Sequence, residues 1–176
     1  MTSPDIQLRT FGRDHAEEIR GLLLDTHDDA YADSDEEFDG RERFAWFVDH
    51  WSALDGYACV VAYDGTEPVG FAYGAPLAAG KEWWRGHLAP APGHGATFAL
   101  SELLVRPKWR RTGVSARLHR ALIDDRPERM AVLLVDVEHP KVQALYESWG
   151  YRKVGEQRPF PDAPLYAVML VDLEPV

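Results

Sequence analysis

Residues 103–115 read Leu-Leu-Val-Arg-Pro-Lys-Trp-Arg-Arg-Thr-Gly-Val-Ser, and they join an apolar strand to the start of an amphipathic helix. The first N–H groups of such a helix have no intrahelical acceptor, and together with the helix dipole they form a site for an anion. Gly113 allows an anion to approach the backbone closely, while Arg110 and Arg111 add positive charge and forked donors. The stretch predicts a phosphate-binding turn, although a plain turn with solvated arginines explains these residues equally well on their own.

The segments before this turn alternate between strand and helix patterns. Residues 14–17, Asp-His-Ala-Glu, have the form of a capping box that opens the first helix, with Ala16 and Ile19 on its inner face. Period-two alternation and helical spacing together predict a strand at Ile6–Phe11, that helix, a second helix carrying Phe44, Phe47, Val48 and Trp51, and strands at Tyr57–Tyr63, Val69–Ala75 and Thr97–Val105.

The segments after the turn complete a mixed α/β pattern. They are a helix carrying Val114, Leu118, Ala121 and Leu122, a buried strand at Ala131–Val135, a helix from Pro140 to Gly150 with Val142, Leu145 and Trp149 on one face, and strands at Tyr151–Val154 and Leu165–Val171. The order is strand, two helices, three strands, helix, strand, helix, two strands. We expect residues 1–176 to form a single α/β domain.

Residues 76–96 show no period and are rich in glycine and proline. A loop of this length in a compact domain is usually functional or mobile. Trp83 and Trp84 either cover an acceptor by cation–π contact or, as we expect, pack the loop onto the domain. Two further side chains carry simple expectations, Cys59 being part of the core and His119 being solvated on its helix.

Composition narrows the class of protein. Hydrophobic residues make up 45% and charged residues 27%, as in ordinary globular proteins, and no apolar run is long enough to cross a bilayer. The first residues lack the features of a signal peptide, and the single cysteine fits a reducing compartment, so we expect a cytoplasmic protein. Cysteine-pair metal sites are excluded, and we expect no metal.

The net charge of −10 is concentrated in one segment. Residues 25–39 hold eight acidic residues and no Lys or Arg, which leaves 21 acidic and 19 basic residues elsewhere. A nucleic-acid-binding protein needs a basic face, so this distribution argues against one. The eight carboxylates either attract a cationic ligand or only keep the protein in solution.

The stretch Arg110-x-x-Gly113-x-Ser115 resembles the acetyl-CoA signature of the GCN5-related N-acetyltransferase (GNAT) family, which is Arg or Gln, two residues, Gly, one residue, then Gly or Ala. The resemblance implies the GNAT fold, with a mostly antiparallel sheet and helices on both faces. It also implies that backbone amides of the turn bind the pyrophosphate and that the preceding strand pairs with the pantetheine arm. The implied cofactor-binding residues are Leu103, Leu104, Val105, Arg110, Arg111, Thr112, Gly113, Val114, Ser115 and Ala116.

A second resemblance lies downstream, in residues 139–151. The family motif has an Asn, a Leu-Tyr pair whose tyrosine comes seven residues later, and an aromatic residue after a glycine. Here His139 stands in place of the Asn and can supply one donor to the pantetheine arm, and Tyr146 stands at the tyrosine. In many family members that tyrosine protonates the departing thiolate of coenzyme A; the alternative is that its hydroxyl only positions the cofactor.

Glu102 is the remaining candidate for the chemistry. A carboxylate in the strand before the turn could take the amine's proton, bind a cationic acceptor, or form a structural ion pair. The resulting hypothesis is an acetyl-CoA-dependent N-acetyltransferase that acts on a primary amine, with a cationic acceptor favoured and a homodimer common in the family. The alternative is an acyl-CoA-binding sensor without activity on the same fold. A nucleoside triphosphate enzyme is excluded because no Lys-Ser/Thr follows the glycine turn.

Overall fold

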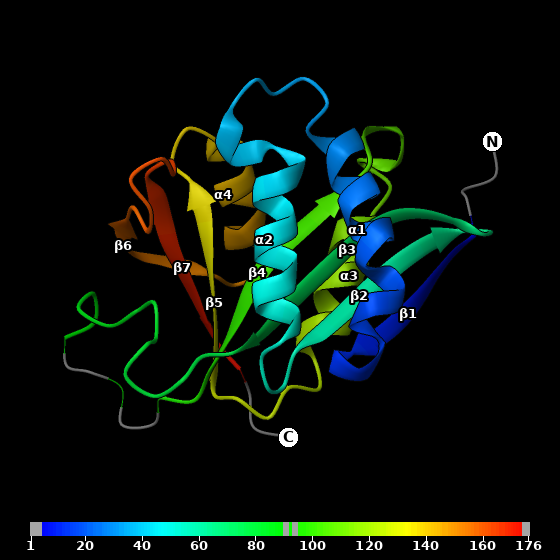
Figure 1. The fold of residues 1–176 in the computed structure, drawn as a ribbon. Helices are drawn as coiled ribbons and strands as arrows, with labels where there is room; N and C mark the ends of the chain where they lie inside the picture. The colour runs from blue at the N-terminus through cyan, green and yellow to red at the C-terminus, as the bar shows by residue number, and fades with distance from the viewer. Residues whose placement is uncertain (1–4, 90–91, 93–94, 174–176) are drawn as a thin grey trace. The chain divides into compact units, whose positions relative to one another are not determined.

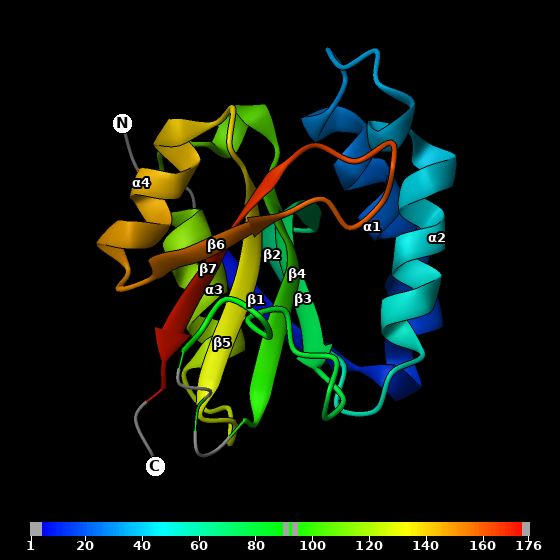
Figure 2. The same ribbon diagram turned by 90° about the vertical axis from the view of Figure 1, so that its left-hand side faces the viewer.

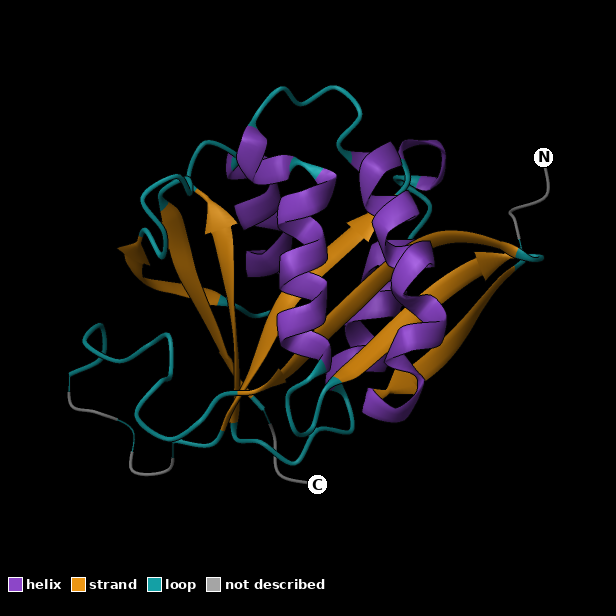
Figure 3. Ribbon diagram, in the orientation of Figure 1, coloured by secondary structure: helices purple, strands orange, loops and turns teal. Residues whose placement is uncertain are grey.

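The computed structural model describes residues 5–89, 92 and 95–173. Its helices and strands follow one another in the predicted order (Figures 1 and 3). They are β1 (Ile6–Gly12), α1 (Ala16–Ala30), α2 (Arg41–Ser52), β2 (Ala58–Asp64), β3 (Glu67–Pro76), β4 (Thr97–Val105), α3 (Val114–Ile123), β5 (Met130–Asp136), α4 (Pro140–Ser148), β6 (Arg152–Gln157) and β7 (Tyr166–Asp172).

The strands follow the order β1-β2-β3-β4-β5-β7-β6 and are mostly antiparallel, with β4 and β5 parallel. The predicted α/β fold is therefore confirmed. The chain divides into two compact units, which we call the first unit (residues 5–75 and 102–126) and the second unit (residues 76–101 and 127–173, as far as described). A single domain over residues 1–176 stays a prediction.

The first unit is a sheet with helices on both faces. β1 and β3 flank β2 in antiparallel register, with Leu8 opposite Ala62 and Val60 opposite Ala72. Figures 1 and 2 show α1 and α2 on one face of these strands and α3 on the other. The buried face of α2 carries Phe44, which lies near the ring of Phe71 in β3. Apolar side chains on alternate strand positions thus hold both helix layers.

The second unit pairs the start of β4 with β5 and then adds β7 and β6. The buried β5 matches the predicted apolar strand, and α4 packs against it. On α4 the apolar face expected from Val142 and Leu145 is exposed, at 43% and 41%, whereas Tyr146 is buried. Periodicity locates an apolar stripe on a helix, but it does not say whether that stripe meets the core.

Two local expectations are wrong. The capping box at residues 14–17 does not form, because a 3-10 turn precedes α1 and its N-cap, His15, makes no side-chain cap hydrogen bond. The acidic segment begins inside α1, which continues to Ala30. His119 is 8% exposed rather than solvated, and burial lowers its pKa to about 4. The core assignment of Cys59 is confirmed, since it has no exposed surface.

Candidate functional site

The turn between β4 and α3 has an unusual backbone. Arg111 has φ of +63° and Gly113, the N-cap of α3, has φ of +85°. Just before them, the buried Trp109 donates its Nε1–H to Asp64 Oδ2 at 3.0 Å. Left-handed backbone is uncommon for a residue with a side chain. The hydrogen bond of Trp109 therefore anchors the start of the turn, and two left-handed residues, Arg111 and Gly113, reverse the chain where the anion site is predicted.

The N-terminus of α3 is open in the way an anion requires. No side chain caps it, and a Cβ built on Gly113 would meet no atom within 4 Å. The first hydrogen bond into the helix is donated by Arg117 to the carbonyl of Gly113. Among the described residues, the N–H groups at 113–116 have no hydrogen bond to the protein. Free donors and free space beside a glycine fit a diphosphate group.

The two arginines of the turn differ in what they contact. Arg110 donates from Nε to the carbonyl of Val105 at 3.2 Å and from Nη2 to the carbonyl of Ala30 at 3.3 Å. Part of its guanidinium therefore ties the turn to β4 and α1, a role that the motif did not suggest. Arg111 is exposed and, within the described residues, makes no hydrogen bond or ion pair.

The end of β4 is held closely against β3. A Cβ on Gly70 would lie 2.8 Å from the carbonyl oxygen of Leu104, so glycine is what permits this approach. Arg106 donates its backbone N–H to Val69 and its Nε to Pro68, at 2.8 and 2.9 Å. These contacts fix residues 103–105, of which Leu103 alone is partly exposed. Gly70 and Arg106 are residues that our sequence reasoning missed, although a glycine inside a strand is a known sign of close backbone approach.

Glu102 lies on β4 just before this anchored end. Its side chain keeps partial exposure but is surrounded by protein, and this desolvation raises its pKa to about 8, with the charge of Asp39 as a second cause. A carboxyl group that titrates near pH 8 can accept or release a proton under physiological conditions. No feature of the sequence around Asp39 indicated this coupling.

His139 and Tyr146 belong to the second unit, on α4. His139 is the N-cap, and its Nε2 lies 3.6 Å from Asp136 Oδ2. Tyr146 is 7% exposed, with Trp149 and Tyr151 packed edge-on at centroid distances of 5.2 and 5.6 Å. This packing orients the phenol ring. The first unit thus brings together Glu102, residues 103–105 and the turn 110–116, while the second unit holds the two α4 residues.

A membrane-spanning helix and a metal-binding cluster are both absent from the described residues. No helix among them is long and apolar enough to span a bilayer. Within the same residues, no group of three or more His, Cys, Asp or Glu side chains is arranged to hold a metal ion.

Comparison with known proteins identifies relatives of this architecture. The model of the acetyltransferase (GNAT) family matches residues 17–151. An acetyltransferase from Thermus thermophilus superposes with a TM-score of 0.67 at 18% identity, covering 98% of this chain and 100% of that one. The ribosomal-protein-S18-alanine N-acetyltransferase from Escherichia coli gives 0.67 at 16%, covering 97% and 96%.

The PaiA N-acetyltransferase from Thermoplasma acidophilum, solved in complex with coenzyme A, gives a TM-score of 0.59 at 11% identity, covering 96% of this chain and 99% of that one. At such identities the structural likeness shows the fold. The search of curated proteins found no match.

Proposed function

The chain belongs to the acetyltransferase (GNAT) family, and we propose that it transfers an acetyl group from acetyl-CoA directly to a primary amine in a ternary complex. The observation that carries this proposal is the open N-terminus of α3, where the left-handed Gly113 leaves both donors and space for a diphosphate. Acetyl transfer also needs one group that accepts a proton from the amine and one that donates a proton to the departing thiolate.

The turn and β4 would hold the cofactor through their backbone. The N–H groups of residues 111–116 would bind the pyrophosphate, with Arg111 adding charge, and residues 103–105 would pair with the pantetheine arm. When bound, acetyl-CoA supplies an acetyl group activated as a thioester. The backbone N–H near Leu104 would donate to the carbonyl oxygen as negative charge develops there. His139 would offer a ring N–H to the same arm.

The proposed transfer forms one C–N bond and breaks one C–S bond. The neutral amine attacks the acetyl carbon, and the coenzyme A sulfur leaves as a thiolate. Glu102 takes a proton from the amine, directly or through water, which fits a carboxyl group of raised pKa. The hydroxyl of Tyr146 protonates the thiolate and regains a proton from solvent, and Glu102 releases the amine's proton to solvent. The products are an amide and free coenzyme A.

The acceptor is proposed to be cationic, as a polyamine, an aminoglycoside or a basic side chain is. The eight acidic residues of segment 25–39 are not all uncompensated, as the sequence had suggested. Arg41 pairs with Asp25 and Asp28, and Arg106 pairs with Asp29. Five carboxylates, those of Asp33, Asp35, Glu36, Glu37 and Asp39, make no ion pair within the described residues. Their negative potential supports attraction of a cation toward Glu102.

Tyr146→Phe tests the enzyme against the alternative of a non-catalytic acyl-CoA sensor. If the phenol is the acid, turnover falls roughly 10²–10⁴-fold while coenzyme A affinity stays within about twofold. Formation of free thiol with a panel of amines measures turnover, and calorimetry measures affinity. A wild-type protein that binds coenzyme A but releases no thiol with any amine supports the sensor instead.

A homodimer and a cytoplasmic location stay predictions.

The pH dependence tests Glu102. Because only the ionised carboxylate can take a proton, kcat/KM should rise with pH and level off above an apparent pKa of about 8. Glu102→Gln should remove this limb and slow the reaction about 100-fold. Two acceptors of different amine pKa separate the enzyme's titration from the substrate's. A limb that follows the acceptor and survives in Glu102→Gln assigns the proton to water.

A further inference from the structure

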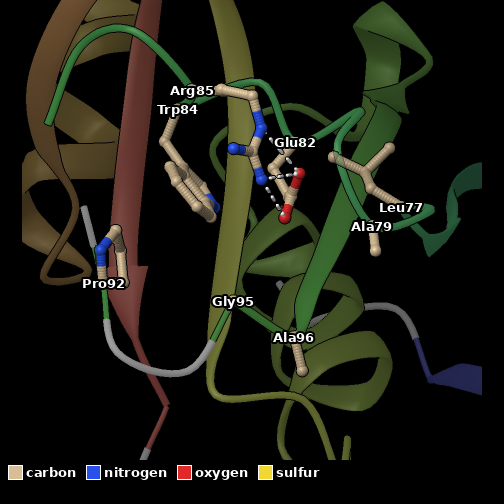
Figure 4. Close-up of a pocket in the computed structure, with 8 residues that line it drawn as sticks. All are labelled: Leu77, Ala79, Glu82, Trp84, Arg85, Pro92, Gly95 and Ala96. Atoms are coloured by element: carbon tan, nitrogen blue, oxygen red, sulfur yellow. Dashed lines mark hydrogen bonds and ion pairs between the residues drawn. The ribbon is translucent and has the colours of Figure 1, made fainter.

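Described residues between 77 and 96 line an open pocket of about 350 Å³ in the second unit, which we call the cavity. Leu77, Ala79, Trp84, Pro92 and Ala96 give it apolar walls, and the ion pair of Glu82 and Arg85 lies inside it (Figure 4). This volume is at the lower end of the range for small-molecule pockets. Apolar side chains beside one ion pair give the cavity a mixed lining, which suits a small ligand with a single polar group.

The ion pair is asymmetric in its burial. The side chain of Glu82 is 5% exposed, whereas that of Arg85 is 52% exposed. Nε and Nη2 of Arg85 donate to Glu82 Oε1 at 3.2 and 2.8 Å, and Nη2 also reaches Oε2 at 3.0 Å. The buried carboxylate therefore holds one edge of the guanidinium, and the hydrogen bond from Arg85 keeps the pKa of Glu82 low.

The other edge of Arg85 keeps its donors. A guanidinium has five N–H groups, and the contacts with Glu82 engage Nε and Nη2 but not the two N–H groups of Nη1. Among the described residues, Nη1 has no acceptor. Figure 4 shows Nη1 pointing away from Glu82 on the side of Trp84, whose ring lies 5.2 Å from the guanidinium carbon. Because Glu82 fixes the plane of the guanidinium fork, Nη1 is positioned to donate charge-assisted hydrogen bonds to the carboxylate of a ligand.

Trp84 fixes the wall beside this fork. It is 3% exposed, and its Nε1–H donates to Thr97 Oγ1 at 2.8 Å, while Thr97 donates to the carbonyl of Gly95 at 2.7 Å. The indole thus cannot turn away without losing a buried hydrogen bond. The guanidinium of Arg85 and the indole of Trp84 are therefore held in a fixed arrangement in the protein without a ligand.

The cavity is remote from α4 within its own unit. It adjoins the start of β4, where Thr97 pairs with Met130 at the start of β5. His139 follows the opposite end of β5, a strand of seven residues that spans roughly 20 Å, and no described residue of α4 lines the cavity. The cavity is therefore separate from the residues proposed here for acetyl transfer in this unit.

We propose that this cavity is a second binding site that takes a small organic carboxylate with a compact apolar body, held end-on by Arg85 against Trp84. The proposal does not depend on acetyltransferase activity. The alternative is that the ion pair only folds the loop and its outer donors are solvated. Binding of a carboxylate, but not of its neutral or cationic analogues, separates the two.

The experiment titrates the full chain with benzoate, benzamide and benzylamine by calorimetry. We expect benzoate to bind at least about tenfold more tightly than either analogue, since only it can form a charge-assisted pair of hydrogen bonds. The Trp84 indole N–H resonance, identified by its absence in Trp84→Phe, should shift with benzoate. No binding of benzoate at about 10 mM, or equal binding of benzamide, would overturn the proposal.

Arg85→Lys keeps the charge beside Glu82 and removes the fork, so benzoate affinity should fall about tenfold. Arg152→Lys is the matched control, an exposed arginine of the same unit paired with Asp172, and should leave the affinity unchanged. Should Arg85→Lys lose the fold of the loop, Leu77→Trp decides, because it fills the cavity and keeps the ion pair. Unchanged affinity in a folded Arg85→Lys or in Leu77→Trp would contradict the assignment.

Discussion

The turn Arg110–Ala116 and the loop 76–96 both contain arginine and glycine, yet the anion donors proposed for them are of different kinds. In the turn the donors are backbone N–H groups beside Gly113, and Arg110 is partly engaged by carbonyl groups. In the loop the donors belong to the side chain of Arg85, fixed by Glu82. A backbone site depends on the absence of a Cβ, and a side-chain site depends on its supporting partner. Anion binding at the turn should therefore be lost when a side chain is added at Gly113, and anion binding in the loop should be lost when the side chain of Arg85 is altered.

Gly113→Val should have the largest effect, because it places a β-branched side chain in the space left for the cofactor and strains a φ of +85°. We expect coenzyme A affinity to fall at least about 100-fold by calorimetry. The thermal stabilisation of the wild type by coenzyme A, about 2.7 kcal/mol at a hundredfold excess over Kd, should largely disappear. Benzoate binding in the loop should be unaffected.

Gly65→Val is the matched control for this substitution. Gly65 has φ of +65° in the β2–β3 turn, and its Cβ would also meet no atom within 4 Å. It should cost a similar 1–2 kcal/mol or so of stability for the left-handed backbone, with coenzyme A affinity unchanged. Equal losses of affinity in the two variants would mean that backbone strain, rather than a blocked turn, explains the result.

Lowering the pH should destabilise the first unit more than the loop 76–96 of the second unit. His27 is 4% exposed between the rings of Tyr31 and Phe44, and burial lowers its pKa to about 4. The unfolded chain then binds more protons between pH 6.5 and 4, so this stability is complete above 6.5 and is lost as the pH falls. The lowered pKa of Glu82 affects stability only when the pH falls below 4.5, the usual pKa of a glutamate. His119, whose pKa is also about 4, adds to this loss, whereas the raised pKa of Glu102 opposes it. The two histidines together outweigh the one carboxyl group, so the first unit should loosen before the loop does.

The measurement is hydrogen exchange at pH 5 and pH 7. His27 alone should account for about 2 kcal/mol between these values, and α1 should lose protection before residues 76–89. His27→Phe keeps a stacked ring and should reduce the pH dependence of unfolding. An equal slope in the variant, or earlier opening of the loop, would contradict the comparison.

Trp84→Phe should have the smallest effect of the three. It removes the hydrogen bond to Thr97 and part of a buried ring, and we expect a loss of about 1.5 kcal/mol in urea unfolding. Trp46→Phe is the matched control, since Trp46 is 51% exposed, and should stay within about 0.5 kcal/mol. Equal losses of unfolding free energy in the two variants would show that the indole of Trp84 does not fix the loop.

The sequence by itself determined the order of the elements and the position of the backbone turn. Thr97–Val105 has the bounds of β4, and Gly113 lies at the start of α3 as expected. These features are local, because apolar periodicity and the need for a positive φ are properties of a few neighbouring residues.

Only the tertiary structure decided the state of the side chains. Arg41 and Arg106 neutralise part of the acidic segment, burial sets the pKa of Glu102 and of both His27 and His119, and Glu82 aims the fork of Arg85. Arg106, for example, reaches Asp29 from 77 positions away. A charge's effect depends on its solvent exposure and on partners that the fold brings from distant parts of the chain, and neither is encoded in its immediate neighbours.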